Sequence, residues 1–319
     1  MASRIYYAVI RNRDNLKVDN VGDVLRFCGD DIHLFNPIFK ETLSIKENTA
    51  YEKGDDIEYD GWIATFFKDS QYAQTLELKV VNNNIDNHQP NEYRKHLARV
   101  VIVTNMDESE EGKITFAEGK SSYCEDASLF IRRSKSLKAD SPIEVSSGWR
   151  HVDGQGLLLI NNYTCVKQPR RITLLLMLAI AYFKAFQKIN EELAEALKSI
   201  DDIDKIEKIF SVASKFNARY YFFNPVQVSS YHTYKCWENI RDAFDLQSKY
   251  QETNEQIQQV HQILSHINQK KQEDEKYEHQ KKNDKWNKNI TILAVFLSIV
   301  GLVEAIKAIY ELLVSWNII

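Results

Sequence analysis

The chain has 319 residues and a formal net charge of −4 at pH 7, with 44% hydrophobic and 27% charged residues. This composition is typical of a globular protein with a core, excludes a disordered chain, and excludes a globally basic surface, so neither DNA nor RNA is predicted as a partner. The four cysteines are scattered and form no metal-binding spacing, which predicts no structural metal site and suits a reducing compartment.

Residues 1–168 have the pattern of a β-rich domain with short helical insertions. Runs of β-branched and aromatic residues, separated by turn residues, predict strands at Ile5–Ile10, Ile57–Phe67, Ala73–Val81, Arg99–Asn105, Ile114–Ala117, Ser128–Arg132 and Gly156–Cys165. Short helices are expected at Val21–Phe27 and Asn91–Leu97. The predicted fold class is therefore α+β, with this mixed domain followed by a helical unit.

Basic residues gather after one of these predicted strands. Arg132 and Arg133 come first, and Lys135, Lys138, Arg150 and His151 follow. Such a patch suits a small anionic or nucleotide ligand, and the alternative is a solvated surface. A second pair, Arg170 and Arg171, stands beside Pro169 at a predicted helix N-terminus, where backbone N–H groups favour phosphate.

Residues 169–288 are predicted to form a helical domain. The first helix, Ile172 to about Ile200, begins with an apolar run that ends at Lys184 and is too short for a membrane span, so a buried core helix is expected. Asp201 and Asp202 are candidate caps for the next helix. The third helix is a long stalk, capped by Ser229 or Ser230, whose apolar residues recur in steps of four and three at Leu246, Tyr250, Thr253, Ile257, Val260, Leu264 and Ile267. This coiled-coil seam indicates either self-association or packing within the same chain.

Residues 289–319 contain an apolar segment that begins with an uncharged run, Asn289–Val303. As a helix, the segment Ile290–Trp316 is about 40 Å long, enough to cross a ~30 Å hydrocarbon core. Trp286 and Trp316 bracket it as interfacial aromatics do, and lysines precede it, which predicts a single-pass C-terminal anchor with the bulk of the chain cytoplasmic. The alternatives are a helix lying on the lipid membrane and a helix in a soluble bundle.

Small and polar residues line one side of this segment, and three of them are charged. The candidate pore-lining or helix-packing residues are Thr291, Ser298, Gly301, Glu304, Lys307 and Glu311. Small residues allow helices to approach closely in lipid, and ionisable residues there face partners or water. A lone helix would expose these charges to lipid, so we expect self-association through the stalk and the tail. The most specific version of this hypothesis is that the helices surround a pore.

The motifs of common enzyme sites are missing from the chain, including the phosphate-binding glycine loops, Gly-x-Ser-x-Gly and His-Glu-x-x-His. We therefore predict no catalytic residues and no cofactor. His232 and Cys236 stand four residues apart and share a helical face, which suits either two metal ligands or a packing role.

The order of parts from Phe210 to Ile306, with a long helix running into KWNKNITILAVFLSIVGLVEAI, resembles the CorA-type divalent-cation transporter superfamily. The resemblance implies an α/β cytoplasmic domain, a stalk and a membrane segment. The Gly-Met-Asn signature and the second membrane helix of that family are missing here, so magnesium selectivity is not carried over, and no family residue is transferred. The sequence is also similar to tail-anchored CorA-like proteins without transport and to CorA-like antiviral effectors of bacteria.

The leading hypothesis is a tail-anchored oligomer whose cytoplasmic domain senses a ligand or partner and gates a pore or ion flux, as an antiviral-defence effector would. A non-conducting membrane scaffold and, less favoured, an enzyme with an unrecognised N-terminal site are the alternatives.

Overall fold

The computed structural model describes residues 3–12, 26–27, 30–47, 61–81, 96–105, 116–145, 148–161, 167–198 and 202–315. The contacts divide the chain into two compact units, Met1–Val260 and His261–Ile319. The expected sheet domain and most of the expected helical domain thus fall in the first unit, and the apolar segment falls in the second.

The first unit is built on one eight-stranded sheet with the strand order β4-β5-β6-β1-β7-β10-β9-β8. The strands are β1 (Ser3–Asn12), β4 (Ser44–Glu47), β5 (Trp62–Phe66), β6 (Gln74–Val81), β7 (His96–Asn105), β8 (Ile143–Val145), β9 (Gly148–Asp153) and β10 (Gly156–Asn161). The β7–β10 pair is parallel and the other neighbours are antiparallel. Two short strands, β2 (Arg26–Phe27) and β3 (Asp30–Asp31), form a separate ladder, and α1 (Pro37–Lys40) follows them.

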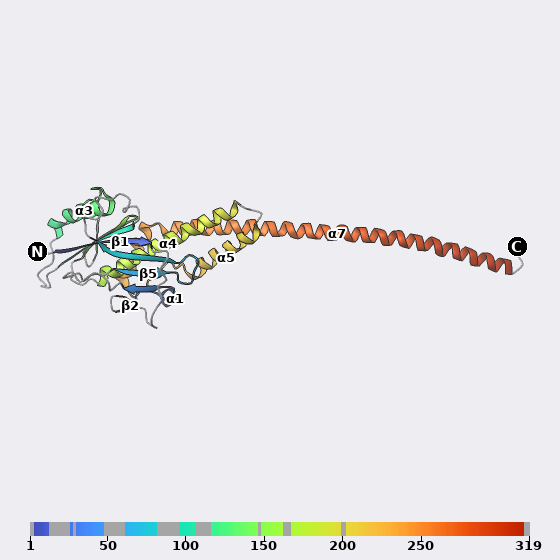
Figure 1. Ribbon diagram of the computed structural model, residues 1–319, viewed down its shortest axis with the longest axis horizontal. Coiled ribbons are helices and arrows are strands. Elements are labelled where there is room, and N and C mark those ends of the chain that lie inside the picture. The colour runs from blue at the N-terminus through green and yellow to red at the C-terminus, as the bar shows by residue number, and fades with distance from the viewer. Residues whose placement is uncertain are drawn as a thin grey trace. The chain divides into compact units, whose positions relative to one another are not determined.

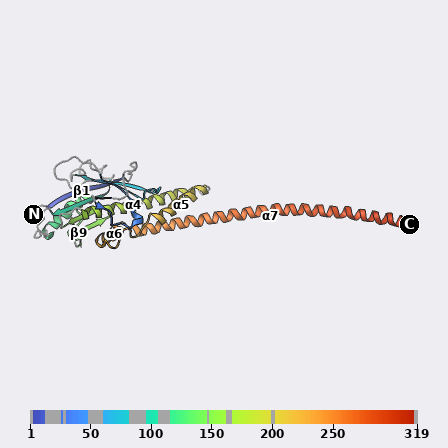
Figure 2. The ribbon, with the colours of Figure 1, turned by 90° about the horizontal axis from the view of Figure 1, so that it is seen from below.

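Helices cover both faces of the central strands. Helix α3 (Phe116–Arg132) lies against β7 and β10, and its Cys124, Ala127, Phe130 and Ile131 pack with Val9, Val101, Val103, Leu158 and Ile160. The intervening residues point to the other face, where α4 (Lys167–Leu197) packs on β5, β6, β7 and β10. Figure 2 shows the strand layer that contains β1 beside α4. Because both faces are covered, all four residues of Leu157–Ile160 are buried, which explains the unbroken apolar run of β10.

The remaining helices of the first unit are α5 (Ile203–Arg219), α6 (Tyr231–Ala243) and the start of α7 (Leu246–Ser315) (Figure 1). An aromatic cluster joins them to α4, in which Phe186 contacts Phe216, Tyr221 and Tyr250. The apolar run of α4 is buried from Ile172 to Tyr182, which confirms the predicted core helix. Although α4 is long and apolar enough to cross a membrane, 78% of that stretch is buried. Asp202 caps α5 by accepting a hydrogen bond from the Lys205 backbone N–H at 3.2 Å, as predicted.

Four predicted elements are wrong in type over the residues that the structure describes. The predicted strand Ser128–Arg132 is the last part of α3, and Phe116 and Ala117 of the predicted strand Ile114–Ala117 begin it. The buried residues Cys124, Ala127, Phe130 and Ile131 follow helical spacing, but a short apolar run does not distinguish helix from strand. Arg26–Phe27 and His96–Leu97, assigned to predicted helices, are strand residues instead. Residues 21–25, 57–60, 91–95, 114–115, 162–165, 199–201 and 316–319 of the predicted elements lie outside the described residues.

The predicted single stalk helix is two helices. They are separated at Phe244 and Asp245, and Asp245 has a left-handed backbone with φ 47°. The Asp245 carboxylate accepts a hydrogen bond from the Ser248 hydroxyl at 2.6 Å, which ties the break to the first turn of α7 without any Gly or Pro. Four residues of the seam are buried within the first unit, namely Leu246, Thr253, Ile257 and Val260. This part of the seam therefore packs within the same chain, which was one of the two alternatives.

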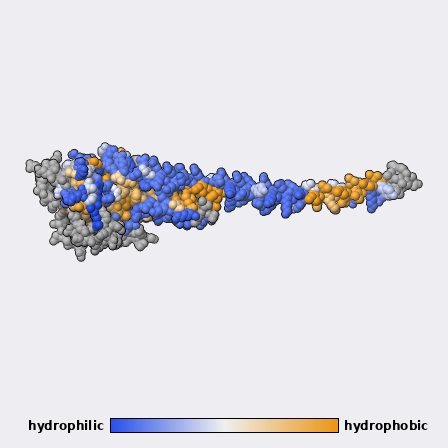
Figure 3. All heavy atoms as spheres, turned by 90° about the horizontal axis from the view of Figure 1, so that it is seen from above, coloured by the Kyte–Doolittle hydropathy of each residue, from blue (hydrophilic) through white to orange (hydrophobic). Residues whose placement is uncertain are grey.

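The second unit consists of residues 261–315 of α7. Every residue described from Asn268 to Leu312 is exposed. Polar residues come first, and from Ile290 onward the surface is mainly apolar, as the orange part of this helix in Figure 3 shows. The helix is long and apolar enough to cross a membrane, and none of its apolar stretch is buried, which is compatible with a membrane anchor.

Candidate functional site

The predicted basic patch is divided between the two faces of the sheet. Alternate residues of β9 point to opposite sides, so His151 and Asp153 lie on the side of α3, and Arg150 lies on the side of α4 and α6. The predicted set therefore contributes to two separate sites.

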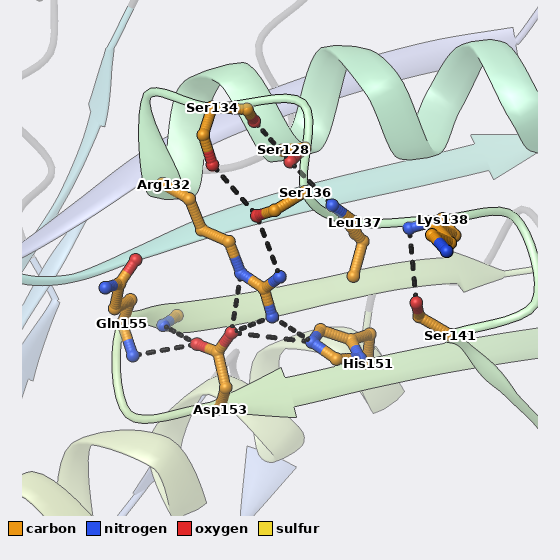
Figure 4. A network of polar contacts seen from close by, with 11 residues as sticks. Ser128, Arg132, Ser134, Ser136, Leu137, Lys138, Ser141, His151, Asp153 and Gln155 are labelled. Carbon is orange, nitrogen blue, oxygen red and sulfur yellow. Dashed lines mark hydrogen bonds and ion pairs between the residues drawn. The ribbon is translucent and has the colours of Figure 1, made fainter.

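On the α3 side, Arg132 is the centre of a polar network (Figure 4). Its guanidinium binds the Asp153 carboxylate through Nη2 and through Nε, the latter at 2.8 Å, and Nη1 lies 3.2 Å from the Ser136 hydroxyl. Nη2 is also 2.8 Å from Nε2 of His151. The same ring nitrogen lies 3.5 Å from the Asp153 carboxylate, so His151 contacts both members of the Arg132–Asp153 ion pair. The network joins the end of α3 to the β9–β10 hairpin.

Asp153 also organises the hairpin turn. Its Oδ1 accepts the backbone N–H groups of Gln155 at 2.8 Å and of Gly156 at 3.0 Å. Burial by itself raises the pKa of Asp153, but the hydrogen bonds from His151, the Gln155 backbone and Arg132, together with the charge of Arg132, outweigh it and hold the pKa well below its usual range. The charge of Arg132, predicted to bind an external anion, is thus neutralised inside the fold.

The other predicted anion-binding arginines lie apart from Arg132. Arg133 follows α3, is exposed, and has a left-handed backbone with φ 53°. Arg170 and Arg171 are half-buried in the first turns of α4, which begins two residues before Pro169. The structure therefore does not gather the four predicted arginines at one place.

On the other face, a cavity of about 70 Å³ lies between β9, β10 and the first turns of α4 and α6. Its polar lining residues are Arg150, Gln168, His232, Lys235 and Cys236, and its apolar ones are Val145, Trp149, Leu159, Ile160, Pro169 and Ile172. We call it the Arg150 cavity. Among the described residues that line it, none is a carboxylate.

Arg150 is a buried cation, with only 3% of its surface exposed. Its Nη1 contacts the Cys236 sulfur. With the Asn239 amide in the orientation that satisfies its hydrogen bonds, the amide oxygen accepts from Nη2 at 2.9 Å. The Nε atom is buried and has no hydrogen-bond partner among the described residues. Both partners of Arg150 are neutral groups, although burying a guanidinium normally requires an anionic partner.

His232 and Cys236, whose spacing suited either two metal ligands or a packing role, both line this cavity. Cys236 is occupied with Arg150, and the described residues contain no group of three side chains that would hold a metal ion. Burial raises the pKa of the Cys236 thiol, and Arg150 opposes that rise. The pair therefore belongs to the wall of the Arg150 cavity.

The predicted residues of the apolar segment all lie in α7 of the second unit. The hydroxyl of Thr291 donates to the Asn287 carbonyl at 2.9 Å, and that of Ser298 donates to the Ala294 carbonyl at 2.8 Å. These hydroxyls are thus satisfied by their own helix, as an apolar surrounding requires. A methyl group added at Gly301 would meet no atom within 4 Å, and Glu304, Lys307 and Glu311 are exposed.

The Arg150 cavity was not predicted as a unit, because its polar residues come from three distant parts of the sequence. The sequence signal was Arg150 inside a strand next to the apolar strand that contains Leu157–Ile160. Comparisons with protein-family models, with curated proteins and with solved structures find no match for this chain.

Proposed function

We propose that the chain is a membrane protein anchored by the C-terminal part of α7, with the first unit as its ligand-sensing part. The observation that carries the proposal is the exposed apolar surface of Ile290–Leu312. These 23 residues form about 34 Å of helix, which matches the ~30 Å hydrocarbon core of a bilayer. Lys281, Lys282, Lys285 and Lys288 precede this stretch and favour a cytoplasmic location for the bulk of the chain.

The energetics of this stretch favour an assembly over a single helix. Its thirteen Ile, Leu, Val and Phe residues each gain about 0.3–0.6 kcal/mol on insertion, whereas Glu304, Lys307 and Glu311 each cost up to ~3 kcal/mol near the membrane centre. The two contributions are of similar size, so a lone helix gains little. Self-association removes the cost, because the charged side chains then face each other or water.

A pair of lysine substitutions tests the anchor. In Leu297→Lys with Val300→Lys, two charges replace apolar residues in the middle of the stretch, at a cost of about 5–7 kcal/mol. We expect the unchanged protein to resist alkaline carbonate extraction from membranes and the double variant to be released. The matched control is Tyr277→Lys with Gln280→Lys, which has the same spacing on an exposed polar part of α7 and should stay in the membrane fraction. Release of the unchanged protein would rule out an integral anchor.

In its finer form, the proposal is that Glu304, Lys307 and Glu311 line a pore whose opening lowers the membrane potential, as in an antiviral effector. Their i, i+3 and i+7 spacing on one helix face supports this form, together with an order of parts that resembles that of CorA-type transporters. Glu304→Leu should then abolish ion flux into liposomes without changing the cross-linked mass, while Glu278→Leu on the polar part of α7 should leave flux unchanged.

The non-conducting scaffold is the second candidate, favoured by the satisfied hydroxyls of Thr291 and Ser298, which need no water-filled surrounding. In that case the purified protein is cross-linked as an oligomer but does not make liposomes leak. Unchanged flux in Glu304→Leu would contradict the pore form and leave the anchor intact.

A further inference from the structure

We propose that the Arg150 cavity is the binding site for a small organic anion, whose carboxylate or phosphate group is held by Arg150 and whose apolar part packs on Leu159, Pro169 and Ile172. The inference deepens the sensing role proposed for the first unit by naming the class of ligand. It does not require the membrane anchor.

The first argument is the charge of Arg150. A buried guanidinium is stable when it pairs with an anion, yet its partners here are a thiol and an amide. Its Nε is left without a partner in a side chain that is 3% exposed. An anion in the adjoining cavity would supply the missing partner, and bidentate binding of carboxylate or phosphate is the geometry for which guanidinium is suited.

The second argument is the composition of the rest of the wall. Gln168 adds an amide donor to the wall. Lys235 also lines the cavity, and its ammonium forms an exposed ion pair with Glu238 at 2.7 Å. The cavity also lies at the first turns of α4 and α6, where backbone N–H groups and the helix dipole favour negative charge. The N-cap residue of α6, Ser230, makes no side-chain cap hydrogen bond, so its hydroxyl does not occupy those N–H groups.

The third argument is size and polarity. A cavity of about 70 Å³ holds several waters or one small polar group, since a single water needs about 10–15 Å³ measured in this way. The apolar side of the wall, with Leu159, Pro169 and Ile172, suits a hydrocarbon or ring attached to the charged group. A bare inorganic ion would leave this side unused.

Cys236 provides the test, because it lines the cavity beside Arg150. Iodoacetate is itself a small organic anion, and iodoacetamide is its neutral counterpart. In both reactions the thiolate sulfur forms a bond to the CH₂ carbon and iodide leaves. We would measure both alkylation rates at Cys236 by mass spectrometry, in full-length protein in detergent and in the same protein unfolded in urea.

The expected result is a ratio of iodoacetate to iodoacetamide rates at least about tenfold higher in the folded protein than in the unfolded protein, which corresponds to ~1.4 kcal/mol of charge recognition. Benzoate should slow the iodoacetate reaction, and benzyl alcohol should not. Arg150→Gln should return the ratio to the unfolded value. The control Arg241→Gln, which removes another buried arginine of the same unit, should keep the high ratio.

Equal ratios in folded and unfolded protein would overturn the proposal, as would a Cys236 that reacts with neither reagent before the protein unfolds. If Arg150→Gln does not fold, protection by benzoate in the unchanged protein still decides the question. Because the assay needs no membrane, its failure is distinguishable from failure of the anchor.

Discussion

Arg150 and His151 are neighbours in β9, yet they contact opposite layers of the fold. The Arg150 guanidinium contacts Cys236 in α6, and the His151 ring lies 2.8 Å from Arg132 at the end of α3. The alternation of side chains along a strand causes this separation. One basic cluster in the sequence therefore becomes a neutralised structural network on one face and, on the other, a buried cation beside a cavity with no anionic partner among the described residues.

The Arg132–Asp153 pair should contribute to stability in a pH-dependent way. Asp153→Asn should lower the free energy of unfolding by about 1–3 kcal/mol at pH 7, measured by urea denaturation, because it removes a charge-assisted hydrogen-bond partner. The folded-state pKa of Asp153 is depressed, so its contribution is complete above the unfolded pKa of ~4 and is lost as the pH falls further. The difference between the two proteins should therefore shrink below about pH 4. Asp140→Asn, on an exposed carboxylate, is the control.

Gly156 is required by the close approach of β10 to β7. A Cβ atom there would lie 2.1 Å from the backbone oxygen of Arg99, and backbone cannot move aside cheaply. We expect Gly156→Ala to lower the free energy of unfolding by at least ~2 kcal/mol. Gly154→Ala, two residues away in the same hairpin, meets no atom within 4 Å and should change stability by less than ~0.5 kcal/mol. Equal effects in thermal unfolding would contradict this placement of β10.

The left-handed backbone conformation at position 245 should destabilise the fold when most other residues replace Asp245. Asp245→Ala loses the bond from Ser248 and keeps the left-handed conformation, so a loss of about 1–3 kcal/mol is expected. Asp245→Gly should lose less, because glycine adopts this conformation without strain. Urea denaturation of the two variants gives the comparison, and an alanine variant as stable as the glycine variant would indicate a continuous helix through this position.

If the seam packs within the chain, Tyr250 should contribute to the stability of the first unit. Its ring stacks on Tyr221 with centroids 4.1 Å apart and also contacts Phe186 at 6.1 Å. Tyr250→Ala should lower the free energy of unfolding by ~2 kcal/mol, and Tyr250→Phe should be nearly neutral because it keeps the ring. If the seam served only association between chains, Tyr250→Ala would instead reduce cross-linked mass without changing the unfolding of a monomer.

Several elements were predictable because their signals are local. The apolar run of α4, the Asp202 cap of α5 and the strands β1, β6 and β7 follow from short stretches whose pattern matches one structure. Helix α3 was not predictable in the same way, since Ser128–Arg132 by itself fits either a strand or the end of a helix. The break at Asp245 was missed because aspartate occupies left-handed backbone rarely, and neither Gly nor Pro marks the position.

The sequence by itself determined the apolar segment Ile290–Leu312, because length and continuous apolar composition are properties of a single stretch of chain. It also determined the α+β class, since the periods of strands and helices are local. Only the tertiary structure decided what the charges do. The contact of Arg150 with Cys236 joins residues 86 positions apart, and that of Arg132 with Asp153 joins residues 21 positions apart on the other face. Whether an arginine is neutralised or left facing a cavity depends on which strand face and which helix end meet it, and no local pattern carries that information.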